Sequence, residues 1–221
     1  MPDMHRRGPE PPPGVPQIQR KPGLAKEMMR ELAPLLAEEG IDLENIDVPD
    51  LETLQAAMNR AVERHNMARF TPVGHARDLA VATLQLVIQA ITGGDTAGAA
   101  ATLERVEPES PENAVATVAG CIGVSLGLLD DWLTGAEPQA PKHLGQRVGL
   151  PAGHWTGERA ATDILVLARK GRAFRSLDTL IARQGGTSVL YGSVLTLTAA
   201  TQTWSAITNT SVAELARATV R

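Results

Sequence analysis

Residues 113–133 read NAVATVAGCIGVSLGLLDDWL, and this stretch decides the fold class. Its larger apolar side chains recur at steps of three and four, the spacing that lines one face of an α-helix. These positions are Val118, Ile122, Leu126, Leu129 and Leu133. A second face carries only small side chains, at Ala116, Gly120, Gly123 and Gly127. Small side chains let a neighbouring helix axis come close, so the stretch predicts a buried helix.

A second long segment, residues 184–213, carries no charged residue. Within it, residues 188–198 are rich in β-forming residues, and the alternation over 194–198 also suits a strand. The corresponding segment in the first half of the chain is the stretch 113–133, which has helical spacing. We therefore interpret both segments as buried helices. Its many Thr, Gln and Asn residues make it too polar for a lipid-facing span.

The two halves of the chain share a pattern of a helix, a glycine, a short helix and a long helix that ends in Trp. Gly94, Leu103, Gly120 and Trp132 in the first half correspond to Gly171, Leu180, Gly192 and Trp204 in the second. Each unit exposes an apolar face that only a neighbour can cover. The sequence therefore predicts an all-α, multi-helix bundle of two similar three-helix units packed together.

Turn and cap residues divide the chain into five segments. We predict a disordered Pro-rich arm (1–22), an N-terminal helical hairpin (23–70), a first helical unit (71–135), a connector (136–155) and a second helical unit (156–221). Seven of the fifteen prolines lie in the arm, and proline lacks the amide donor that a helix needs. The predicted helix N-caps in the two units are Thr71, Asp95, Ser110 and Thr156, and a last short helix is predicted over residues 211–219.

Composition bounds the class of protein. The chain has 221 residues, of which 3 % are aromatic, so Leu, Val, Ile and Ala must build the core. No apolar stretch follows Arg6 and Arg7, which argues against a secretory signal and predicts a cytoplasmic location. Seventeen of the 21 basic residues are Arg, which suggests a bacterium with a GC-rich genome. Cys121 is the single cysteine, and we interpret it as a small buried hydrophobic residue.

Charge is unevenly distributed along the chain. The net charge is −4, but residues 95–137 carry one basic and eight acidic groups, and residues 138–221 carry ten basic and four acidic groups. These opposite signs can be satisfied within one fold or across a head-to-tail contact between chains.

Candidate catalytic and metal-binding patterns are weak. Residues 123–127 read GVSLG and match the nucleophile elbow by letter, but they lie inside a helical stretch, whereas that chemistry needs a strand-to-helix turn. A metal site would combine His75 and Asp78, three residues apart on one helical face, with His65 from across a turn. The alternative for these residues is a surface His–Asp pair. The sequence contains no cofactor-binding motif.

Two charged groups are candidates for ligand binding. Asp130 and Asp131 end the helix before Trp132, where the helix dipole disfavours carboxylates, so a basic partner or a cation would explain them. Arg169, Lys170 and Arg172 concentrate positive charge at one corner between helices. They could bind phosphates, although the acidic chain has few aromatic residues to stack on bases, and nucleic acid is not an expected partner.

Together these patterns predict a helical interaction or scaffold protein without catalytic activity, which associates with itself or with another protein. The alternative is a helical-bundle enzyme or a ligand- or metal-binding protein with its site near His75, Asp78, Asp130 and Asp131. The two hypotheses differ in structure. An enzyme brings these groups together in a pocket, whereas a scaffold leaves them scattered and exposes an apolar patch.

Overall fold

The computed structural model describes residues 67–104, 111–151 and 155–221 and a few isolated positions between 33 and 56; of residues 111–116 it describes the backbone. The chain divides into two units, 1–63 and 64–221, and the second is described here. The predictions for the arm at 1–22, for the helices between residues 23 and 66 and for His65 fall outside the described residues.

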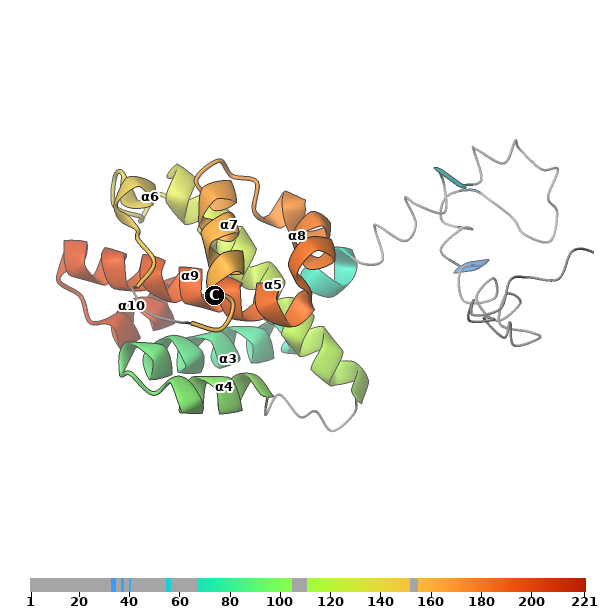
Figure 1. Cartoon of the computed structure of the whole chain (residues 1–221), viewed down its shortest axis with the longest axis horizontal. Coiled ribbons are helices and arrows are strands. Elements are labelled where there is room, and N and C mark those ends of the chain that lie inside the picture. Colours follow the sequence, from blue (N-terminus) through green and yellow to red (C-terminus); the bar gives the residue numbers. More distant parts are fainter. Residues whose placement is uncertain are drawn as a thin grey trace, which may run out of the picture. The chain divides into compact units, whose positions relative to one another are not determined.

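Every regular element in the described ranges is a helix, so the all-α, multi-helix prediction is confirmed (Figure 1). The helices are α3 (His75–Thr92), α4 (Thr96–Glu104), α5 (Pro111–Thr134), α6 (Leu144–Arg147), α7 (Glu158–Ala168), the 3₁₀ turn η1 (Phe174–Ser176), α8 (Leu177–Gln184), α9 (Gly186–Thr208) and α10 (Val212–Thr219). None of these helices combines the length and apolarity that a bilayer crossing needs.

Helix α9 is the centre of this unit. It packs against α3, α5 and α7 and against the short helices around them. In Figure 1, α3 and α4 lie on one side of α9, and α6, α7 and α8 lie on the other. Its buried threonines satisfy their hydroxyls within the helix: Thr196 donates to the Gly192 carbonyl at 2.8 Å and Thr198 to the Val194 carbonyl at 2.9 Å. The helix therefore tolerates β-forming residues in its interior, as the repeat pattern predicted.

The two long helices each use a glycine to approach the first helix of their own half. A Cβ at Gly120 in α5 would lie 3.2 Å from the Cβ of Ala80 in α3. A Cβ at Gly192 in α9 would lie 2.7 Å from the Cβ of Ala160 in α7. Both approaches leave no room for a larger side chain. The arrangement repeats in the two halves, and a common origin of the halves stays a prediction.

The predicted N-cap Asp95 has the expected hydrogen bond, and Ser211, predicted as the first residue of the last helix, is the N-cap of α10. The Asp95 carboxylate accepts from the Gly98 amide at 2.8 Å, and the Ser211 hydroxyl accepts from the Glu214 amide at 3.2 Å. Each therefore satisfies a free amide in the first turn of its helix.

Thr71 and Thr156 do not cap the helices that follow them. The Thr71 hydroxyl donates backwards, to the Met67 carbonyl at 3.1 Å. Helix α3 begins only after Gly74, and α7 begins after Gly157, both with positive φ. The glycine turns separate each threonine from the free amides that a cap must reach.

Candidate functional site

Asp130 holds two parts of the fold together. Its carboxylate accepts hydrogen bonds from the backbone amides of Ala173, at 2.9 Å, and Phe174, at 3.0 Å. These amides open the η1 turn, so Asp130 ties the end of α5 to the corner that follows α7. Partial burial raises the pKa of Asp130, and the two amide hydrogen bonds oppose that shift. The lone pairs of this carboxylate are thus directed at backbone groups of its own chain.

Arg169 fixes the connector between the two halves. Its Nε donates to the Gly145 carbonyl at 2.8 Å and its Nη2 donates to the Val148 carbonyl at 2.7 Å. Both carbonyls belong to α6 or to its C-terminal end. The planar guanidinium presents several N–H donors in a fixed fork and can bind two carbonyls at once. A lysine ammonium is a compact point charge and matches this geometry less well.

The other predicted ligand-binding residues, Asp131, Lys170 and Arg172, are exposed. Asp131 lines a shallow hollow beside Phe70 and Phe174, whereas Arg169 lines a different one beside α6. The structure therefore does not bring the five residues into one cavity.

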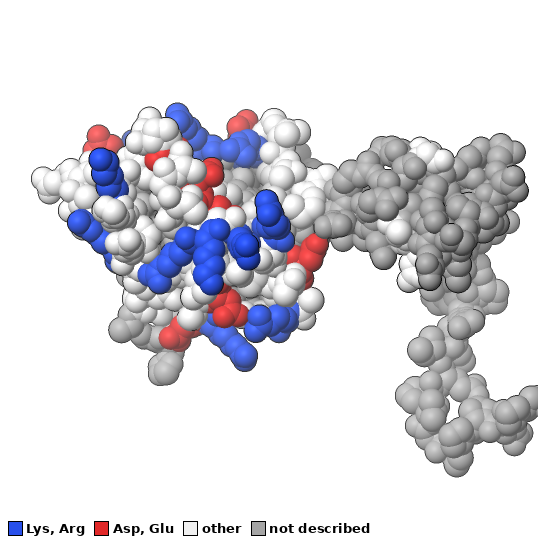
Figure 2. All heavy atoms as spheres, turned by 90° about the horizontal axis from the view of Figure 1, so that it is seen from above, with Lys and Arg blue, Asp and Glu red and all other residues white. Residues whose placement is uncertain are grey.

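The surface above α6, α7 and α8 is basic. Residues 138–185 hold eight basic and three acidic side chains. Figure 2 looks onto the unit from the side on which these helices lie in Figure 1, and it shows Lys and Arg gathered across the middle. Lys170 and Arg172 follow α7 and belong to this stretch of the chain.

His75 and Asp78 lie exposed in the first turn of α3. Their predicted partner His65 is outside the described residues. Within the described part of the chain, no three His, Cys, Asp or Glu side chains are placed so that they could hold a metal ion.

Ser125 and Cys121, the two candidate nucleophiles on α5, are buried in the packed interior. Ser125 has no solvent-exposed surface and lies in the middle of the continuous α5 helix, so the GVSLG stretch does not form a nucleophile elbow. The Cys121 thiol donates to the Ala80 carbonyl at 3.7 Å, and burial raises the pKa of this thiol to about 12. A thiol with that pKa carries almost no thiolate at neutral pH, and it is therefore unreactive.

After its first turn, which exposes His75, Arg77 and Asp78, helix α3 presents an uncharged surface. Between Leu79 and Gly94 the chain has no charged residue. Val73, Leu79 and Leu86 are 82, 41 and 59 % exposed, and Ala82 between them is also exposed. Leu79 and Leu86 are seven residues apart, so they lie on the same side of the helix. We call Leu79, Ala82 and Leu86 the α3 face.

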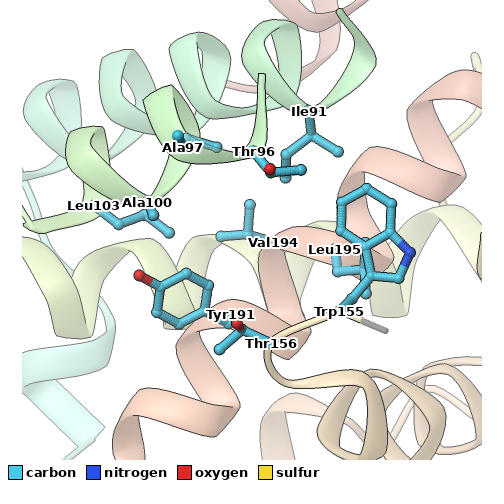
Figure 3. Close-up of a pocket in the computed structure, with 11 residues that line it drawn as sticks. Ile91, Thr96, Ala97, Ala100, Leu103, Trp155, Thr156, Tyr191, Val194 and Leu195 are labelled. Atoms are coloured by element: carbon cyan, nitrogen blue, oxygen red, sulfur yellow. The ribbon is translucent and has the colours of Figure 1, made fainter. Parts of the chain in front are cut away.

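A pocket of about 460 Å³ lies between α4 and α9 (Figure 3). Its lining comprises Ile91, Thr96, Ala97, Ala99, Ala100, Leu103, Trp155, Thr156, Tyr191, Val194 and Leu195. In Figure 3 the rings of Trp155 and Tyr191 stand on the α9 side, opposite the small side chains of α4. Burial raises the pKa of Tyr191, and the nearby Glu104 adds to that shift. We call this space the α4–α9 pocket.

The sequence did not single out Trp155, Thr156 and Tyr191 as site residues. One signal was available: α4 reads TAGAAATLE, with four alanines and a glycine among nine residues. A helix this poor in large side chains cannot fill the space on its inner side.

No protein-family model, curated protein or solved structure matches this chain. The candidate surfaces and the pocket are therefore interpreted from their own chemistry.

Proposed function

We propose that this chain is a helical interaction protein, without catalytic activity, that associates with a second copy of itself through the α3 face. The observation that carries this proposal is the apolar α3 face within a run of sixteen residues, 79–94, that has no charge. Single exposed apolar residues are common on soluble proteins, whereas a continuous uncharged face is typical of an interface.

The chemistry of the α3 face favours a second copy as its partner. A two-fold contact brings a surface against itself, so any charge on it meets a like charge or must be desolvated. The three side chains of the α3 face carry no charge, and the charged residue nearest to them is Asp78 in the first turn of α3. In an antiparallel pairing centred near Ala82, Leu79 of one chain lies near Leu86 of the other, and each leucine contributes about 1 kcal/mol through its newly buried apolar area.

The alternative, an enzyme or a ligand- or metal-binding protein with its site near His75, Asp78, Asp130 and Asp131, has less support. Asp130 is engaged by two backbone amides, and the other three side chains are exposed. We retain the cytoplasm as the expected compartment and another protein as the alternative partner.

Light scattering of the full chain and of Leu86→Arg, at micromolar concentrations, tests the proposal. We expect the wild type to have twice the 23.4 kDa mass of one chain and the variant to have the mass of one chain. An arginine at this exposed position leaves the fold intact but places two like charges in the contact.

Val166→Arg is the matched control, because Val166 on α7 is 47 % exposed and lies outside the α3 face. This variant should keep the wild-type mass. A monomeric wild type removes the self-association claim, and a dimer that survives Leu86→Arg removes the α3 face as its interface.

A further inference from the structure

The α4–α9 pocket exists because α4 packs mainly on α3 and presents short side chains towards α9. Ala97 and Ala100 face the space but do not reach Val194 and Leu195 on the other side (Figure 3). Side chains normally fill the space between neighbouring helices to crystal-like density. The unfilled volume of about 460 Å³ lies within the range of small-molecule sites in proteins.

The lining of the pocket restricts what can bind there. None of its eleven residues is charged, and eight have apolar or aromatic side chains without a hydroxyl. An ion that entered would lose hydration without gaining a counter-charge, which is unfavourable. The indole of Trp155 and the phenol ring of Tyr191 offer flat apolar walls, which suit an aromatic or branched hydrocarbon group.

Three hydroxyl groups provide the polar contacts. They belong to Thr96, Thr156 and Tyr191, and none of them has a hydrogen-bond partner within the described part of the chain. The Trp155 indole N–H is also buried without a partner there, but in Figure 3 it lies on the side of its ring that points away from Tyr191. The hydroxyls, and not this N–H, are thus the groups that a ligand in the pocket can meet.

We propose that the α4–α9 pocket binds an uncharged, mainly hydrophobic small molecule that carries a hydroxyl or carbonyl group, with Trp155 and Tyr191 as its walls. The hydrocarbon part displaces water from the apolar lining, and the polar group pairs with one of the free hydroxyls. The pocket shares no residue with the α3 face, so this binding is independent of self-association.

Titration of the full chain with N-phenyl-1-naphthylamine, a neutral probe that fluoresces in apolar surroundings, tests the site. We expect saturable binding of one probe per chain. Ala100→Trp fills the pocket and should weaken probe binding at least tenfold. Ala97→Phe also reduces the pocket and should weaken binding in the same direction; it serves as the test if Ala100→Trp does not fold.

Ala101→Trp is the control, since Ala101 lies on the same helix but does not line the pocket. It should bind the probe as the wild type does. So should Leu86→Arg, and loss of binding in that variant would place the probe on the α3 face and overturn the inference.

Displacement of the probe tests the ligand class. 4-Phenylbutan-1-ol should displace it at a concentration at least tenfold lower than 4-phenylbutyrate, which has the same skeleton but carries a charge. Equal displacement by both compounds contradicts a site for uncharged ligands. Unsaturable probe binding, or wild-type binding by both pocket-filling variants, contradicts the site itself.

Discussion

Trp132 at the end of α5 and Trp204 near the end of α9 pack edge to face, with ring centroids 5.1 Å apart and ring planes at 85°. Both indoles are buried. They occupy corresponding positions of the repeat that the sequence predicts, and their contact joins α5 to α9. Aromatic pairs in this geometry contribute about 0.5–1.5 kcal/mol beyond their area burial.

Removing either indole should destabilise the fold strongly. We expect Trp132→Ala and Trp204→Ala to lower the free energy of unfolding by about 3–5 kcal/mol each, because a large buried side chain is lost and a cavity remains. The double variant should lose about 0.5–1.5 kcal/mol less than the sum of the single losses. Urea unfolding of the four chains measures this coupling, and strict additivity would show that the rings do not interact.

Gly192→Ala should destabilise the protein by about 1–3 kcal/mol through overpacking. The new methyl would lie 2.7 Å from the Cβ of Ala160 and 2.7 Å from the amide nitrogen of Ala161. The control is Gly127→Ala in α5, where a Cβ meets nothing within 4 Å. That change should stabilise the helix by about 0.5–1 kcal/mol. Thermal unfolding distinguishes the two, and equal shifts would contradict the close α7–α9 contact.

The contribution of Asp130 to stability should depend on pH. Its pKa is raised in the folded chain above the ordinary value of 3.8, so between these two values the folded state binds more protons than the unfolded state. Stability from this group therefore falls as the pH rises through that window and is constant above it. Asp130→Asn removes the titration. The difference in urea midpoint between wild type and variant should change between pH 4 and the raised pKa, and a constant difference would contradict the shift.

Arg169→Ala should loosen the connector around α6. The Gly145 and Val148 carbonyls lose their donors, and residues 136–151 should become accessible to protease and exchange their amides faster. Arg169→Lys should have little more protease resistance than Arg169→Ala, because one ammonium does not replace the two N–H donors of the guanidinium. Lys170→Ala is the control: the Lys170 side chain has no hydrogen bond within the described part of the chain, so this variant should digest as the wild type does.

Much of the helical architecture could be predicted from side-chain spacing. The steps of three and four around Leu126 predicted α5, and comparison with it assigned residues 188–198 to a helix although their composition suits a strand. The Asp95 cap was also predicted, because its donor and acceptor are only three residues apart. The N-cap predictions for Thr71 and Thr156 were wrong, because a glycine turn lies between each threonine and the start of its helix.

The candidate site could not be predicted in the same way. Asp130 finds its amide partners 43 and 44 residues later in the chain, and no local pattern marks that pairing. Formal charge selected Asp130 and Arg169 as ligand-binding residues, whereas their geometry directs both at backbone groups of the same chain. The α4–α9 pocket is a space that no side chain fills between two helices. Spacing patterns describe which side chains share a helix face, so they do not reveal such a space.

Disulfide cross-linking at Ala82 tests the proposed two-fold contact most directly. Ala82 lies at the centre of the α3 face. In an antiparallel pairing, Ala82→Cys therefore places one new cysteine on each chain with their Cα atoms about 4.4–6.8 Å apart, the separation that a disulfide needs. Under mild oxidation we expect this variant to form a covalent dimer, while Val166→Cys and the wild type, whose Cys121 is buried, stay monomeric on a non-reducing gel. Monomers at position 82, or equal cross-linking at positions 82 and 166, would contradict self-association through the α3 face.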